Sequence, residues 1–348
     1  MLGPEVGWMP LGFGIVEWRF DQDTLREITA VLCFGRKQTR ASALTLLPAP
    51  IAPGKVGERR EKGVSFLLEE FEEAYGEESG DEYAAEIAAY VMEVEAKLLP
   101  RKDISTLDHC FIDRRAYAIN ELGRAWSSFK TWLDYSEETL WIAVNIFDRY
   151  FAVAKDSMTW NGCCLLTLVA LFMASKYWEV SLPCLDDFAR VVGLDSSKTG
   201  FRRGEKLVLK SLDYVICGGC SPWFWLNRRD RRQQQGGGLT EAVEDFLVQL
   251  AMRDPRFSAV LPSMVAATVA YTVNRMELTE SMVEKGWAED LWRVYDDVEI
   301  ERGSKLLVEG LLSKELKASW VYRWYKREER HGASEFAVRW AKVYGDGC

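Results

Sequence analysis

The chain has 348 residues, 48% of them hydrophobic and 28% charged, which is ordinary for a soluble globular protein with room for two domains. Its net charge of -9 argues against a protein that binds nucleic acid directly through bulk electrostatics. Only two histidines, His109 and His331, are present, which weakens any catalytic triad or histidine metal site; we expect no enzyme active site, no metal and no cofactor.

The eight cysteines are too sparse for a disulfide scaffold. The N-terminus lacks a basic region followed by an apolar stretch and a cleavage site, so no secretory signal is apparent. We therefore expect free thiols in a reducing compartment, which means a nuclear or cytoplasmic location. Cys217 and Cys220 form a lone CxxC; a glycine-rich turn is favoured there over zinc or redox chemistry.

Residues 1–80 give weak signals. Aromatic residues are scattered without a period, three prolines at 48, 50 and 53 interrupt the segment, and an acidic run extends from Glu69 to Glu82. Charge runs are usually solvated faces or flexible linkers. The sequence therefore predicts a variable, partly disordered extension over residues 1–80.

Residues 81–100 predict an amphipathic N-terminal helix. Its apolar positions recur at helical spacing and stop at Pro100. These positions are Tyr83, Ile87, Tyr90, Val91, Val94 and Leu98.

Five helical patterns then fill residues 101–220, at 113–126, 137–154, 159–177, 185–192 and 200–215. Ser136 is a good N-cap for the second of them. The third carries no charge from Ser157 to Ser175, and a helix that is apolar on all sides must be buried in a core or cross a membrane. Because the run is short for a membrane span and is interrupted at Asn161 and Gly162, a buried central helix is the better interpretation.

Residues 221–240 predict a linker with a polar insert at 227–238. The glycines and charges of this insert favour a solvated surface loop, and its arginine cluster offers a nuclear import address or a phosphate contact as the alternative. Helical patterns resume at 240–252, 263–274, 278–284, 288–312 (with a possible break near Gly303) and 320–329, and Ser263 is a candidate cap. The fold class is therefore all-α: two five-helix bundles in tandem, with the second over 241–348, preceded by the N-terminal helix.

Three motifs of the first bundle occur in a fixed order: Glu138-Thr139-Leu140 with Asp148-Arg149-Tyr150, then Ala174-Ser175-Lys176-Tyr177-Trp178-Glu179, then Gly204-Glu205-Lys206-Leu207-Val208. Together with Arg115 and Leu122 upstream, they resemble the cyclin box. The chain is identified as a divergent member of the cyclin family, most similar to the A- and B-type (mitotic) cyclins. The resemblance implies that Arg115, Asp148 and Arg149 are structural residues of the box.

The resemblance further implies that Lys176 and Glu205 face the mobile regulatory helix of a cyclin-dependent kinase. A charge at the end of a buried helix is costly unless it is paired or bound by a partner. An internal Lys176–Glu205 salt bridge is the compatible alternative. The resemblance also implies that five apolar side chains pack against the kinase; packing in the protein's own core is the equal alternative. These residues are Tyr177, Leu209, Ile216, Ile87 and Tyr90.

The chain departs from the family pattern where A-type cyclins form an apolar docking groove for short substrate and inhibitor peptides. Arg114 and Glu121 place charges among the groove-lining positions, and charged side chains are unfavourable in an apolar binding groove. The complete set of these positions is Arg114, Tyr117, Ala118, Glu121 and Cys164. We therefore expect a degenerate groove.

The function expected from the sequence is that of a non-catalytic regulatory subunit. It would bind and activate a cyclin-dependent serine/threonine protein kinase in cell-cycle progression, without contacting nucleic acid or membrane. The alternative is a cyclin-fold adaptor or transcription-related cyclin that binds its partners without activating a cell-cycle kinase.

Overall fold

The computed structural model describes residues 84–101, 103–154, 160–182, 184–186, 188, 198–216, 220–226, 238–278 and 295–344. Throughout these ranges the regular elements are helices, and no strand occurs among them. The prediction of an all-α fold is therefore confirmed. The predictions for residues 1–80, for most of 185–192, for 278–284 and for the polar insert lie outside the described residues.

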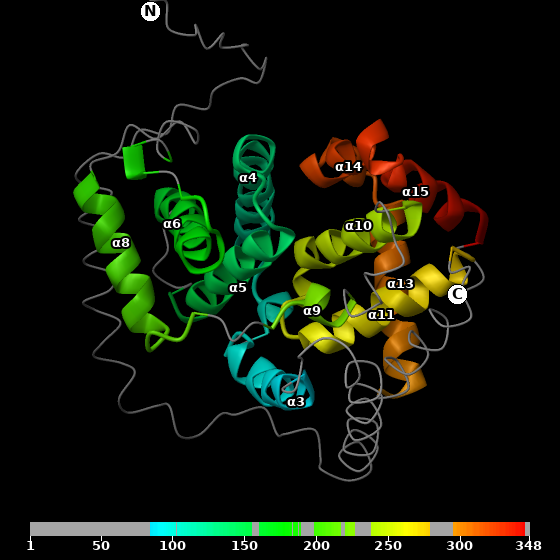
Figure 1. The fold of residues 1–348 in the computed structure, drawn as a ribbon, viewed down its shortest axis with the longest axis horizontal. Coiled ribbons are helices and arrows are strands. Elements are labelled where there is room, and N and C mark those ends of the chain that lie inside the picture. Colours follow the sequence, from blue (N-terminus) through cyan, green and yellow to red (C-terminus); the bar gives the residue numbers. More distant parts are fainter. Residues whose placement is uncertain are drawn as a thin grey trace, which may run out of the picture.

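The first bundle is organised around α6 (Trp160–Trp178). Helices α4 (His109–Leu133), α5 (Glu137–Ala154) and α8 (Lys198–Ser211) pack against it. Helix α3 (Ala84–Glu95) precedes this bundle and continues into the short helix η1 (Ala96–Leu98). Figure 1 shows α8 at the left edge of the molecule with α6 on its inner side. The uncharged sequence of α6 therefore forms a buried central helix, as predicted.

The second bundle contains α9 (Pro222–Leu226), α10 (Leu239–Arg253), α11 (Pro262–Arg275), α13 (Asp297–Leu312), α14 (Trp320–Tyr325) and α15 (Ala333–Tyr344). Short 3-10 turns join them: η4 (Pro255–Phe257), η5 (Leu316–Ala318) and η6 (Glu328–Arg330). Figure 1 shows this bundle beside the first, with α10 facing α4 and α5.

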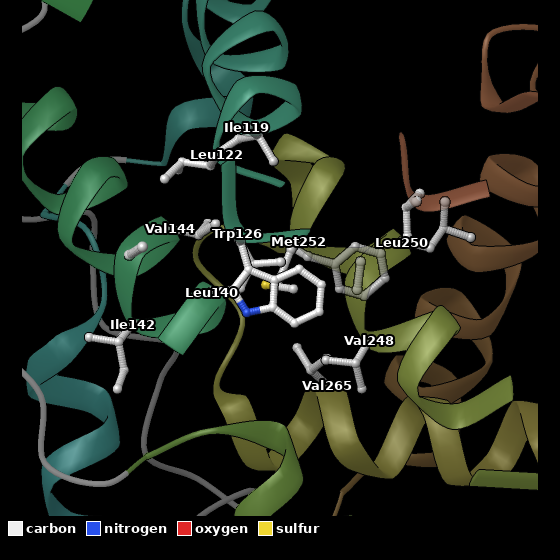
Figure 2. Close-up of a cluster of buried hydrophobic side chains, with 14 of the residues drawn as sticks. Ile119, Leu122, Trp126, Leu140, Ile142, Val144, Val248, Leu250, Met252 and Val265 are labelled. Atoms are coloured by element: carbon white, nitrogen blue, oxygen red, sulfur yellow. The ribbon is translucent and has the colours of Figure 1, made fainter. Parts of the chain in front are cut away.

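The buried apolar side chains of the two bundles form one continuous cluster. Figure 2 shows Trp126 of α4 beside Met252 of α10, with Val265 of α11 below them. Trp126 also meets the rings of Trp320 and Trp324 edge to face at 5.9 and 5.8 Å. The bundles are therefore fixed to each other by core packing.

Helix α4 is longer than the predicted 113–126. It begins at His109 and continues to Leu133, where Asp134 adopts a left-handed conformation (φ 54°) and donates its backbone N–H to the Lys130 carbonyl. The added turns bury Phe129, which stacks on Tyr135 at 5.1 Å. Burial of this aromatic ring explains why the helix extends beyond the residues with a clear amphipathic period.

Other boundaries also differ from the predictions. Helix α9 lies within the predicted linker and is buried, because its Trp-Phe-Trp sequence inserts into the core. Helix α15, which no sequence pattern predicted, follows two left-handed residues, His331 and Gly332. The possible break near Gly303 is wrong, since α13 is continuous there; the glycine instead leaves room for Thr268.

No helix among the described residues combines the length and the apolarity that crossing a membrane requires.

Candidate kinase-docking site

Lys176 and Glu205 form an ion pair between the last turn of α6 and the middle of α8. Their side chains are 38% and 18% exposed, so the pair lies at the surface of the first bundle rather than in its core. The Lys176 ammonium also lies 4.9 Å from the centre of the Phe172 ring. Partial burial lowers the pKa of Lys176, and the Glu205 carboxylate supplies the compensating charge. The internal salt bridge considered from the sequence is therefore present.

The residues that follow Lys176 are exposed and apolar. Tyr177, Trp178 and Leu182 are nearly half exposed, and Val180 is fully exposed. Glu179 does not share this exposure, because its carboxylate accepts hydrogen bonds from the Ser136 N–H at 2.8 Å and from the Thr139 hydroxyl. Burial raises the pKa of Glu179. Glu179 thus ties the end of α6 to the start of α5.

The turn after α8 presents a second apolar group. Asp213 and Tyr214 both adopt left-handed backbone conformations (φ 52° and 61°), which is uncommon for residues other than glycine. This turn exposes Tyr214 and Val215, whereas Ile216 is half-buried against the core. Val180, Tyr214 and Val215 were not singled out from the sequence, although isolated apolar residues in turns were a signal for them.

Leu209 lies one turn after Glu205 on α8 and is half-buried. On α3, Tyr90 is 58% exposed, and the side chain of Ile87 lies outside the described residues. The structure thus brings Lys176, Glu205 and Leu209 together on neighbouring turns of α6 and α8. The assignment of these residues to a kinase contact stays a prediction.

The box residue Arg115 is only 1% exposed and makes four hydrogen bonds. Its Nε and Nη2 atoms donate to the two carboxylate oxygens of Asp148 at 2.8 and 2.7 Å. The same guanidinium donates to the carbonyls of Met252 and Arg253, at the end of α10. These carbonyls have no intrahelical donor, so Arg115 caps a helix of the second bundle from within the first.

Arg149, the third box residue, donates to the Ile216 carbonyl at 3.0 Å. Its neighbour on α5, Asn145, donates to the Leu98 carbonyl at 2.8 Å. Helix α5 therefore holds both the end of the N-terminal segment and the chain that leaves α8.

Helix α3 is also tied to the second bundle. The buried Glu95 carboxylate accepts hydrogen bonds from the Ser263 N–H at 3.1 Å and the Ser263 hydroxyl at 2.6 Å. Ser263 was a candidate cap for its own helix, and this expectation is wrong: its hydroxyl is turned to Glu95, and no side chain of α11 caps that helix. A residue distant in sequence supplies the cap, which no local pattern could indicate.

The groove positions also come together, where α4 passes α6. Glu121 pairs with Arg124 at 3.0 Å, and the Arg114 guanidinium lies 5.5 Å from the centre of the Phe111 ring. Burial, together with the charge of Glu121, raises the pKa of Tyr117 to about 12. The remaining two positions, Ala118 and Cys164, are buried, and burial raises the pKa of the Cys164 thiol.

The CxxC segment has a packing role at its second cysteine. Cys220 is buried, and its thiol donates to the Val91 carbonyl of α3 at 3.5 Å. Cys217 lies outside the described residues. Within the part of the chain that the structure describes, no group of three His, Cys, Asp or Glu side chains could hold a metal ion.

Comparison with known proteins matches both bundles. The family model described as the cyclin N-terminal domain matches residues 86–217, and the one described as the cyclin C-terminal domain matches residues 221–338. The two models follow each other in order, as the two bundles do.

Several mitotic cyclins are similar to the chain. G2/mitotic-specific cyclin-2 of Saccharomyces cerevisiae is 27% identical over 271 residues, which cover 76% of this chain and 52% of that protein. G2/mitotic-specific cyclin-2 of Medicago sativa is 32% identical over 139 residues, covering 40% of this chain and 41% of the relative. Cyclin-B2-2 of Arabidopsis thaliana is 30% identical over 135 residues, covering 39% and 30%.

The chain thus matches about half or less of the length of each of these relatives, at low identity. The matched models nevertheless span both helical bundles, and the box residues Arg115, Asp148 and Arg149 bond within and between those bundles. The chain therefore belongs to the cyclin family, as a divergent member similar to the mitotic B-type cyclins.

Proposed function

We propose that this chain is a non-catalytic regulatory subunit that binds and activates a cyclin-dependent serine/threonine protein kinase in cell-cycle progression. The names of several relatives, which are G2/mitotic-specific cyclins, support the cell-cycle part of the proposal. A nuclear or cytoplasmic location fits the free cysteines found among the described residues, because such compartments keep thiols reduced.

The observation that carries the proposal is the partly exposed Lys176–Glu205 pair. An ammonium has three donors and a carboxylate has about four acceptor sites, yet the pair uses one hydrogen bond between its members. The remaining donors and acceptors are available to a second protein at 38% and 18% exposure. A partner that docks there meets a charge pair already held in position by two packed helices.

The way in which such a partner would activate a kinase follows from the requirements of kinase catalysis. Catalysis requires an ion pair between a strand lysine and a glutamate on the kinase's regulatory helix, so a partner that fixes this helix activates the enzyme. Lys176 and Glu205 can hydrogen-bond a backbone segment next to such a helix. The chain would contribute only position and hydrogen bonds, and the phosphoryl transfer would belong to the kinase.

The apolar surroundings of the pair also support a protein partner. Tyr177, Trp178 and Val180 beyond α6 and Tyr214 and Val215 beyond α8 are exposed, and exposed apolar patches commonly mark interaction sites. A docked helix could bury them around the central charges, which is the usual arrangement of a protein interface.

The alternative is an adaptor that binds its partner through the same bundles and activates nothing. Both roles predict a complex, so the discriminating measurement is phosphorylation. The chain should be purified with a panel of cyclin-dependent kinases, and both complex formation and kinase activity should be measured. A complex without activity favours the adaptor, and the absence of any complex contradicts both roles.

Charge reversal tests the site itself. Lys176→Glu or Glu205→Lys should weaken kinase binding by at least about tenfold, which corresponds to about 1.4 kcal/mol. The matched control is Lys326→Glu, because Lys326 forms an exposed ion pair with Glu335 at 2.8 Å, in the second bundle. Undiminished binding of both reversals would contradict the assignment of the site.

The double reversal Lys176→Glu with Glu205→Lys separates the outward role from the internal one. It restores an ion pair between α6 and α8 but exchanges the positions of the charges. If the pair only stabilises the bundle, the double variant should bind like the wild type. If the pair contacts the kinase, thermal stability should recover and binding should not.

A further inference from the structure

Helix α8 exposes four cations on its outer side: Arg202, Arg203, Lys206 and Lys210. We call these four residues the α8 basic stripe. In the part of the chain that the structure describes, no carboxylate forms an ion pair with any of them; the one ion pair of this helix is made by Glu205. Figure 1 shows that α8 lies at the edge of the molecule, so its outer side faces solvent.

The stripe points away from the core, and its residues Arg203 and Lys210 also point away from the proposed kinase contact. Phe201, Val208 and Leu212 mark the buried face of α8. At about 100° per residue, Leu209 lies roughly 80° from the centre of that face, whereas Lys210 lies roughly 180° from it. A kinase docked on the flank of Leu209 would therefore leave Arg203 and Lys210 accessible, since they lie roughly 100–120° from Leu209 around the helix.

The charge of the stripe is opposite to that of the whole molecule, which carries -9. Arg202, Lys206 and Lys210 are spaced four residues apart, and like charges at this spacing destabilise a helix. An anionic partner would remove this repulsion. The stripe extends over roughly 12 Å, at about 1.5 Å per residue, which an extended peptide of about four residues can follow.

We propose that the α8 basic stripe binds an acidic segment of a partner protein. A peptide is favoured over nucleic acid because the one aromatic residue of α8, Phe201, is buried and cannot stack on bases, and because the net charge of -9 repels a long polyanion more strongly than a short acidic segment. The site does not depend on the proposed kinase contact, since Arg203 and Lys210 lie about 100° or more from Leu209 around the helix.

The test uses the full chain and a fluorescent peptide of six glutamates, with a six-glutamine peptide as the uncharged control. Binding is measured by fluorescence anisotropy at low and at physiological salt. We expect the glutamate peptide to bind and the glutamine peptide not to bind. The affinity for the glutamate peptide should fall as the salt concentration rises. The variant Arg203→Gln, Lys206→Gln, Lys210→Gln should weaken binding about tenfold, since each exposed ion pair contributes modestly.

The matched control variant is Arg302→Gln, Lys305→Gln, Lys314→Gln, which removes three exposed cations of the second bundle. It should bind the glutamate peptide like the wild type, and both variants should keep the wild-type melting temperature. Equal weakening by both variants, or no binding by the wild type, overturns the proposal.

Two further outcomes would assign the stripe to a different occupant. A single-stranded oligonucleotide is tested in the same way. If it binds more tightly than the peptide and through the same three cations, the occupant is nucleic acid and not a protein. If the glutamate peptide binds only after glutamates 69, 70, 72 and 73 are changed to glutamine, the occupant is the chain's own acidic run. Either result overturns the assignment to a partner protein.

Discussion

Replacing Gly123 by alanine should loosen the contact between the two bundles. A Cβ atom added at Gly123 of α4 would lie 1.8 Å from Cε2 of Trp320 and 2.0 Å from its Nε1. Trp320 is only 5% exposed and packs edge to face on Trp126, so its ring cannot move into solvent. The alanine must therefore displace either the indole ring or helix α4.

The magnitude follows from these distances. Carbon atoms pack at about 3.5–4.0 Å, so the indole must retreat by roughly 2 Å. Overpacking of this kind costs about 1–3 kcal/mol, and a rigid ring between two helices places Gly123→Ala at the upper end. Alanine recovers about 1 kcal/mol through its better helix propensity. The free energy of unfolding should therefore fall by about 2 kcal/mol.

The chain offers graded controls for the same substitution. At Gly310 the added Cβ would lie 3.4 Å from Leu250, an ordinary contact, so Gly310→Ala should be neutral or slightly stabilising. At Gly303 it would lie 2.8 Å from Thr268, and the effect should be intermediate. Urea unfolding followed by circular dichroism measures all three variants.

The ranking of the three variants by free energy of unfolding tests the prediction. If Gly123→Ala is as stable as Gly310→Ala, the close approach of Trp320 to α4 is wrong. The second substitution Trp320→Leu should make Gly123→Ala less harmful than it is alone, because a smaller side chain leaves room for the Cβ. Additive effects of the two changes would contradict a direct contact.

Three further predictions concern buried polar groups. Arg115→Met should lower the free energy of unfolding by about 3–5 kcal/mol by leaving Asp148 buried without its partner, and adding Asp148→Leu should recover part of this loss in urea unfolding. Ser263→Ala should cost about 1–3 kcal/mol and increase proteolysis near α3, because Glu95 loses a hydroxyl donor. Partial burial and the nearby Glu137 carboxylate raise the pKa of Asp245, whose side chain is 22% exposed, to about 8, so the native state retains a proton that the unfolded state releases above about pH 4. Stability should therefore fall between about pH 4 and pH 8, and Asp245→Asn should flatten this fall in pH-dependent thermal melts.

Local sequence patterns were sufficient to predict the helices whose buried residues recur at a regular spacing. The predicted bounds of α5, 137–154, are those observed, and the predicted cap is present: the Ser136 hydroxyl accepts a hydrogen bond from the Glu138 N–H at 3.1 Å. The uncharged run of α6 likewise required burial on every side. In both cases the information lies within the helix itself.

Patterns failed where tertiary packing decides the conformation. Phe129 extends α4 because it stacks on Tyr135 and Phe188, and neither ring is a neighbour within the helix. Helix α9 has five residues, too few to show a period, and is stabilised by burial of Trp223 and Trp225. The Glu95–Ser263 contact joins residues 168 positions apart. Such contacts leave no local trace in the sequence.

The candidate site was in part accessible from the sequence, because the resemblance to the cyclin box pointed to Lys176 and Glu205 as a pair. The resemblance could not say how this pair differs from Arg115–Asp148, which also joins a cation to a carboxylate across two helices. The exposed fractions of the side chains make the distinction: 38% and 18% for the first pair, against 2% and 4% for the second.

Burial also determines what each pair can do. Arg115 uses its donors on Asp148 and on two carbonyls of α10, so a second protein can neither reach nor displace it without unfolding the junction. Lys176 and Glu205 are held by equally rigid helices but retain donors and acceptors toward solvent. A pair that is both positioned and incompletely satisfied is suited to recognition, whereas a fully satisfied one is suited to holding the bundles together. This difference is why the charge reversals at Lys176 and Glu205 should act on binding, while the loss of Arg115 should act on stability.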